Sequence, residues 1–135
     1  FDFTNYDYIV DAIDTVSGKL ALIVNAKKTG TPIISAMGAG NKTDPTAFKV
    51  ADIYKTSVCA LPKVMRRECK KRGIDKLKVV YSTEEPAEKL GKTENVVKKD
   101  PDKPRKDTPA SLAFVPSVVG LIIAGEVVKD VVGRR

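Results

Sequence analysis

The chain has 135 residues, of which 42% are hydrophobic and 30% charged, and a formal net charge of +7. This is the composition of an ordinary globular domain. Histidine is absent, so a Ser-His-Asp or Cys-His catalytic arrangement cannot be assembled from this chain. The two cysteines, Cys59 and Cys69, lack the paired Cys-x-x-Cys spacing of a structural zinc site.

In chain order, the first predicted elements are a strand near 7–13 and a helix near 15–28. The strand is short, apolar and β-branched, which is typical of a strand covered on both faces. The helix is predicted because its apolar residues share one face: Val16, Leu20, Ile23 and Val24.

Asp14 lies at the junction of this strand and helix, and two interpretations of it are open. Asp14 or Thr15 could cap the first turn of the helix, where an acid meets the positive end of the helix dipole. Alternatively, Asp14 lies at the carboxyl edge of an α/β sheet, where ligands bind, and holds a cation next to a phosphate. Composition alone does not choose between them.

The central part predicts strands near 32–37 and 77–82, a short strand around 49–53, and a helix near 60–72. Residues 38–40, Gly-Ala-Gly, are interpreted as a turn and not as a phosphate-binding loop, because the third glycine position is Thr43.

The positive charge of the chain is concentrated in one segment. Residues 62–78 hold eight Lys or Arg against two acids. Helical spacing places five of the basic residues on one face, opposite Leu61, Val64 and Met65: Lys63, Arg66, Arg67, Lys70 and Lys71. This face is either a solvated surface or a contact for a phosphate backbone. Cys69 falls on the apolar side and is expected to be a buried structural thiol, whereas the role of Cys59 is open.

The last third of the chain predicts a loop, a strand and a helix. Residues 84–107 balance seven basic residues with seven acids and contain three prolines, which predicts a flexible loop. A strand is expected near 111–115 and a helix near 116–132. Because that helix is apolar nearly all round, we expect it to be buried between the sheet and a partner subunit, and too short to span a bilayer. Together the elements predict an α/β fold, a Rossmann-like mixed sheet with flanking helices.

Residues 11–21, Asp-Ala-Ile-Asp-Thr-Val-Ser-Gly-Lys-Leu-Ala, resemble the strand-helix signature of the ThiF/MoeB/HesA superfamily of ubiquitin-activating-like enzymes. Three further segments, 34–46, 50–56 and 111–121, look like the tRNA threonylcarbamoyladenosine dehydratase branch. The absence of paired Cys-x-x-Cys motifs agrees with this branch. The resemblance departs from the family pattern at Thr15, which replaces the usual Asn, and at Lys19, which replaces the usual Arg.

The resemblance implies an enzyme that uses ATP and Mg²⁺ to adenylate a carboxylate. It implies that Asp14 is the magnesium-ATP aspartate and that the backbone of Ala12 and Ile13 lines the nucleotide. With a tRNA substrate, Arg66, Arg67, Lys70 and Lys71 would bind the tRNA, whose threonylcarbamoyl group would cyclise with loss of water. A homodimer, a cytoplasmic location and, as a further partner, a sulfur-transfer protein are also expected.

Two alternatives are retained. One is adenylation of the C-terminal glycine of a ubiquitin-like sulfur carrier, as in molybdopterin or thiamine biosynthesis. The other is a non-catalytic dimerisation or RNA-binding module. Because a complete adenylating domain is nearly twice as long and no Gly-rich phosphate loop is present, we expect residues 1–135 to be its C-terminal portion. The chain would then result from design or from proteolysis.

Overall fold

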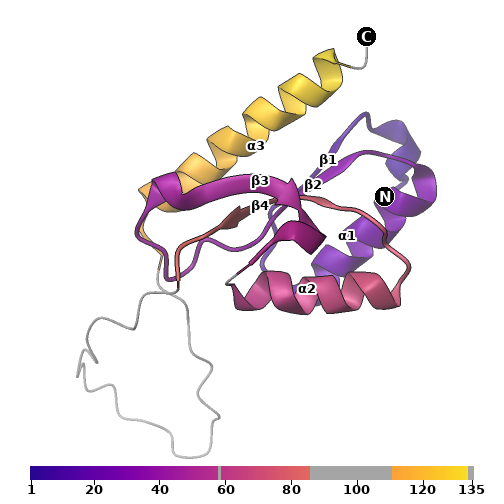
Figure 1. Ribbon diagram of the computed structural model, residues 1–135. Coiled ribbons are helices and arrows are strands. Elements are labelled where there is room, and N and C mark those ends of the chain that lie inside the picture. The colour runs from indigo at the N-terminus through magenta and orange to yellow at the C-terminus, as the bar shows by residue number, and fades with distance from the viewer. Residues whose placement is uncertain (58, 86–110, 134–135) are drawn as a thin grey trace, which may run out of the picture.

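The computed structural model describes residues 1–57, 59–85 and 111–133. In these ranges a four-stranded sheet is flanked by three α-helices (Figure 1). The strands are β1 (Ile9–Asp11), β2 (Ile33–Ala36), β3 (Phe48–Asp52) and β4 (Lys78–Ser82). The helices are α1 (Val16–Thr29), α2 (Ala60–Lys71) and α3 (Phe114–Val132), with short 3-10 turns η1 (Phe3–Asn5), η2 (Pro45–Ala47) and η3 (Ile53–Lys55).

The sheet is mixed and has the strand order β1-β2-β4-β3. β1, β2 and β4 are parallel, and β3 pairs with β4 in the antiparallel direction. The three parallel strands therefore end at one edge of the sheet, which we call the carboxyl edge and define as residues 12–15, 37–42 and 83–85. This arrangement confirms the predicted α/β fold, a Rossmann-like mixed sheet with flanking helices.

The helices form a layer on each face of the sheet. Figure 1 shows α1 and α2 together on one face and α3 on the other. Adjacent residues of β4 point to opposite faces of the sheet. Val79 packs with the α1 and α2 side chains, and Val80 packs with those of α3. Both valines are fully buried. Burial on both faces explains the continuous apolar run of this strand.

The predicted strand at 111–115 is wrong, because α3 begins at Phe114 and residues 111–113 form no strand. Pro116 lies in the first turn of α3. The first four amide groups of a helix have no partner inside the helix, so a proline there removes no hydrogen bond. The remaining elements are confirmed with small shifts of their ends, the largest being β1, which is shorter than the predicted 7–13.

One side of α3 is buried against the sheet, as expected, while the expected burial of its other side against a partner subunit stays a prediction. Val115, Val119 and Ile123 pack on the sheet. Leu121, Val128 and Val132 are 73%, 60% and 62% exposed. None of the helices in the described part of the chain has the length and apolar character needed to cross a membrane.

Most of the predicted flexible loop, 84–107, lies outside the described residues. Its first residue, Glu84, is described and is well anchored. The Glu84 carboxylate accepts hydrogen bonds from the backbone N–H groups of Thr43 and Asp44, at 3.1 and 3.0 Å, and from the Thr43 hydroxyl at 2.8 Å. These bonds lower the pKa of Glu84, the one from Asp44 most strongly. They tie the end of β4 to the turn that follows β2.

Candidate functional site

Asp14 lies in the exposed turn between β1 and α1, at the carboxyl edge. The N-cap residue of α1 is Thr15, and it makes no side-chain capping bond. The interpretation of Asp14 as a helix cap is therefore wrong. Asp14 makes no hydrogen bond or ion pair with the described residues, so its carboxylate is available to a ligand at this edge.

Asp11, three residues earlier, has the opposite environment. It is fully buried at the end of β1, and its Oδ2 lies 3.0 Å from the ammonium group of Lys19, which is 1% exposed. The same oxygen accepts a hydrogen bond from the hydroxyl of Ser35, the neighbouring residue of β2. Lys19 also donates to the carbonyl oxygen of Ala36 at 2.7 Å. The Asp11 carboxylate is therefore occupied by protein groups.

Sequence reasoning missed this buried cluster, although one signal for it was present. A lysine in the first turn of a helix opposes the helix dipole, because cations are favoured at the C-terminal end. Lys19 lies in this unfavourable position, and its ammonium group is paired with the buried Asp11 carboxylate at the end of β1. Lys19, which departs from the family pattern, thus has a structural partner in Asp11.

The predicted nucleotide-lining residues Ala12 and Ile13 are both exposed. The N–H of Ile13 donates to Asp11 Oδ1 at 3.2 Å. This amide is consequently already bound within the protein. What the two residues present outward is the rest of their backbone and the Ile13 side chain, which is 41% exposed.

A second cluster of polar residues lies at the carboxyl edge, around Lys42. This side chain is 4% exposed, and its ammonium group lies 3.2 Å from Cys59 Sγ and contacts the carbonyl oxygen of Glu84. Cys59 precedes the first residue of α2. Lys42 thus holds together the turn after β2, the end of β4 and the start of α2.

Cys69 is confirmed as a buried thiol, with no exposed surface. Burial raises its pKa, although the nearby Arg72 acts in the opposite direction. A raised pKa disfavours the nucleophilic thiolate. Cys69 therefore belongs to the core between α2 and the sheet.

Asp14 offers a single carboxylate as a ligand for Mg²⁺. Among the described residues, no group of three or more His, Cys, Asp or Glu side chains is placed to hold a metal ion. A dedicated protein cage is therefore not formed by this part of the chain. Mg²⁺ in nucleotide sites is commonly held by one or two carboxylates together with phosphates and water, and a single free Asp14 fits that mode.

The predicted tRNA-binding residues lie on α2, but the structure divides them. Arg66 is half-buried and donates to the Thr56 carbonyl oxygen at 2.9 Å. Arg67, Lys70 and Lys71 are exposed. Arg67 and Lys71, with Arg72, surround the Glu68 carboxylate at 3.3, 3.1 and 2.7 Å, respectively. The hydrogen bonds from Arg72 and then Lys71 are the main reason that the pKa of Glu68 falls to about 2.

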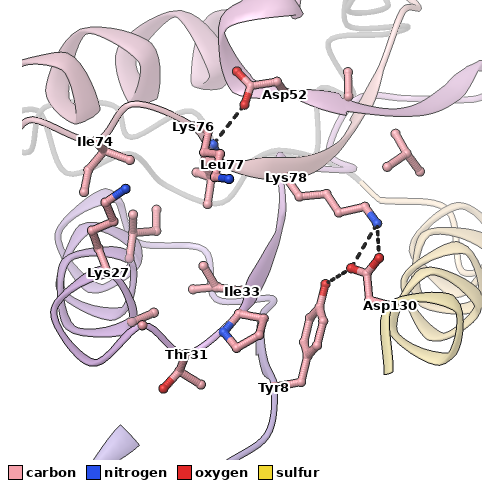
Figure 2. Close-up of a pocket in the computed structure, with 16 residues that line it drawn as sticks. Tyr8, Lys27, Thr31, Ile33, Asp52, Ile74, Lys76, Leu77, Lys78 and Asp130 are labelled. Atoms are coloured by element: carbon pink, nitrogen blue, oxygen red, sulfur yellow. Dashed lines mark hydrogen bonds and ion pairs between the residues drawn. The ribbon is translucent and has the colours of Figure 1, made fainter. Parts of the chain in front are cut away.

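A cavity of about 780 Å³ opens at the other edge of the sheet, where the parallel strands begin. Figure 2 shows that three of its polar side chains bind one another: Asp130 of α3 accepts hydrogen bonds from Tyr8 at 2.6 Å and from Lys78 at 3.0 Å. Asp52 accepts from the Leu77 N–H at 3.1 Å. In open α/β sheets, ligands bind at the carboxyl ends of the strands. The cavity lies on the opposite edge from Asp14.

Replacing Lys78 with methionine is expected to lower the free energy of unfolding by about 1 kcal/mol, the upper end for a partly exposed ion pair. Lys78 also binds Glu126 at 2.7 Å. Hydrogen bonds from Lys129 and Lys78 lower the pKa of Glu126. Burial acts to lower the pKa of Lys78, but its bonds to Glu126 and Asp130 outweigh burial and raise it.

The effect of the Lys78 variant should depend on pH. A lowered carboxyl pKa stabilises the fold above the unfolded value of about 4.3, and this stabilisation is lost as the pH falls through the folded value. Urea titrations of both proteins should show the full difference near pH 7 and a smaller one below about pH 4. A difference that is equal at both pH values would contradict the ion pair between β4 and α3.

The chain belongs to the ThiF family, whose model matches residues 2–135. It is 45% identical over 133 residues to a tRNA threonylcarbamoyladenosine dehydratase of Bacillus subtilis, covering 96% of this chain and 52% of that protein. It is 44% identical over 87 residues to tRNA threonylcarbamoyladenosine dehydratase 2 of Saccharomyces cerevisiae, covering 64% of this chain and 20% of that protein.

A solved structure shares the fold. The crystal structure of the Escherichia coli tRNA N6-threonylcarbamoyladenosine dehydratase in complex with AMP matches with a TM-score of 0.73 and 25% identity, covering 96% of this chain and 50% of that one. The chain thus spans about half the length of the Bacillus relative and of the E. coli protein.

Proposed function

We propose that this chain forms part of an enzyme that uses ATP to activate the threonylcarbamoyl carboxylate of a modified tRNA adenosine, which then cyclises with loss of water. The observation that carries the proposal is Asp14, an exposed carboxylate without a partner among the described residues, at the carboxyl edge of a ThiF-family sheet. The similarity to two tRNA threonylcarbamoyladenosine dehydratases supports the choice of substrate.

In this proposal Asp14 faces the ATP phosphates and, with them, holds Mg²⁺. The bound cation would offset phosphate charge while the substrate carboxylate attacks the α-phosphorus and pyrophosphate leaves; AMP would then leave as the ring closes. Ala12 and Ile13 line the nucleotide through the backbone groups that Asp11 leaves free. We also propose that residues 1–135 are the C-terminal part of the adenylating domain, with the Gly-rich phosphate loop supplied by another segment.

We propose that the tRNA backbone contacts the basic face of α2. Lys63 and Lys70 are exposed and have no hydrogen-bond or ion-pair partner among the described residues, so they are free to meet phosphates. They lie seven positions apart, which places them on one side of the helix about two turns from each other. To bind phosphate, Arg67 and Lys71 would give up their ion pairs with Glu68. Arg66 would have to break its hydrogen bond to the Thr56 carbonyl oxygen.

Replacing Glu68 with glutamine tests this face. The change removes the acid that engages Arg67, Lys71 and Arg72, so tRNA binding is expected to tighten about 3- to 10-fold at low salt, with a steeper dependence of affinity on salt. Filter binding across a salt series measures both quantities. Glu126→Gln removes a carboxylate that also pairs with lysines, but on α3, and should leave tRNA binding unchanged. Equal effects of the two variants would show that general charge, and not the α2 face, governs binding.

The exposed apolar side of α3 is the surface we propose for a homodimer. Leu121, Val128 and Val132 belong to it, and exposed apolar patches on soluble proteins usually mark contacts.

A tRNA substrate is consistent with a cytoplasmic location.

The proposed function is tested by mass spectrometry of the tRNA product. The full-length protein containing this chain is incubated with Mg-ATP and tRNA that carries threonylcarbamoyladenosine, and the digested nucleosides are analysed. Loss of water from the modified adenosine, dependent on ATP, supports the proposal. An unchanged nucleoside, together with ATP-dependent adenylation of a carrier protein ending in glycine, would favour sulfur-carrier activation instead.

A further inference from the structure

We propose that Asp11 is the positioning residue for Asp14, and that the buried cluster of Asp11, Lys19 and Ser35, together with Gly18, fixes the β1–α1 turn in the conformation that presents Asp14 to its ligand. This inference rests on the proposed function for what Asp14 binds. What it adds is the device that holds Asp14 in place.

The first argument is the way Asp11 connects the elements around the turn. One carboxylate oxygen accepts from the N–H of Ile13, inside the turn, at 3.2 Å. The other accepts from Ser35 on β2 and from Lys19 on α1. Asp11 therefore links the turn to α1 and to the neighbouring strand β2. All polar side-chain atoms buried in the described part of the chain have hydrogen-bond partners, so the network is complete.

The second argument is independent and comes from Gly18 on α1. A Cβ atom at this position would lie 2.6 Å from Ile13 Cδ1 and 2.8 Å from Thr15 Oγ1. Such distances are far below ordinary contacts, so a side chain here would force the Ile13 and Thr15 side chains out of their present positions against α1. Asp11 thus holds the turn from inside the sheet, and Gly18 lets it lie against α1. Asp14 lies between Ile13 and Thr15, the two residues whose side chains lie against Gly18.

The third argument is energetic. A buried ion pair is a poor source of net stability, because the cost of removing both charges from water often exceeds their attraction. Lys19 in addition opposes the dipole of α1. Departures from local rules are concentrated at functional sites in real proteins. Here the unfavourable features are the buried pair of Asp11 and Lys19, and Asp11 is bonded to the turn that carries Asp14.

The test uses the full-length protein with the variants Ser35→Ala and Gly18→Ala, which disturb the turn from opposite sides without changing Asp14. We expect the Mg²⁺ concentration that gives half-maximal ATP turnover to rise about tenfold in each, because a displaced carboxylate binds the cation more weakly. A tenfold loss of affinity corresponds to about 1.4 kcal/mol. Ser35→Thr keeps the hydroxyl and should restore the original value. Val119→Ala, on the side of α3 that packs on the sheet, is the control for loss of stability alone and should leave the half-saturating Mg²⁺ unchanged.

Amide hydrogen exchange provides a readout that needs no activity. The Ile13 amide should exchange at least tenfold faster in Ser35→Ala and Gly18→Ala than in Ser35→Thr, with Val119→Ala giving no such local increase. An unchanged Ile13 exchange rate, or the same response in Val119→Ala, would overturn the positioning role. If the original protein shows no Mg-ATP turnover, the proposed function fails, and the exchange rates alone still decide whether Asp11 and its partners fix the turn.

Discussion

Replacing Lys19 with methionine is expected to lower the free energy of unfolding by about 3–5 kcal/mol, because it leaves the buried Asp11 carboxylate without its counter-charge. Asp11 has no exposed surface, and Lys19 is 1% exposed. Water therefore cannot replace the lost ammonium group at low cost. Urea unfolding followed by circular dichroism measures the change.

Two further variants separate the ion pair from other causes. In the double variant Asp11→Asn/Lys19→Met, the charge that lost its partner is also removed, while the amide oxygen can still accept from Ile13. It should regain more than half of the lost stability. Lys28→Met removes an exposed lysine near the other end of the same helix and should change the stability by less than about 0.5 kcal/mol. If Lys19→Met is as mild as Lys28→Met, the buried pair does not have the proposed energetic role.

Replacing Asp14 with asparagine in the full-length protein is expected to reduce ATP-dependent turnover about 10²- to 10³-fold, the size of effect typical of losing one charge-stabilising group at a reacting centre. The side chain keeps its shape but loses its charge. Because Asp14 is exposed and has no partner among the described residues, stability should be nearly unchanged. Release of pyrophosphate over a range of Mg²⁺ concentrations measures the effect.

Asp7→Asn is the matched control for this variant. Asp7 is also an exposed acid close to β1, but it precedes the strand and lies away from the carboxyl edge. It should retain full turnover. Full turnover in Asp14→Asn as well would remove Asp14 from the mechanism.

The fold could be predicted from the sequence where local pattern and tertiary environment agree. α1 and α2 were predicted within one residue because their apolar residues share one face. The region after residue 110 was harder, since Leu112, Ala113, Phe114 and Val115 suit a strand and a buried helix equally well. Only the packing of Val115 with Val119 and Ile123 on the sheet distinguishes the two.

The candidate site was predicted in part. The resemblance pointed to Asp14, and the structure shows it exposed at the carboxyl edge. The partners of Asp11 were not predictable, because Lys19 and Ser35 reach it from elements whose relative placement a sequence pattern does not give. For the same reason, the basic face of α2 could be located from helical spacing, but its partial neutralisation by Glu68 could not be anticipated.

The central claim is that the nucleotide binds at the carboxyl edge beside Asp14 and not in the cavity at the opposite edge. Amide hydrogen exchange of the full-length protein with and without Mg-ATP tests this claim most directly. We predict that Mg-ATP slows exchange in residues 12–18, with no change in residues 27–32 and 74–78, which line the cavity. Slower exchange in the cavity segments, with residues 12–18 unchanged, would contradict the account.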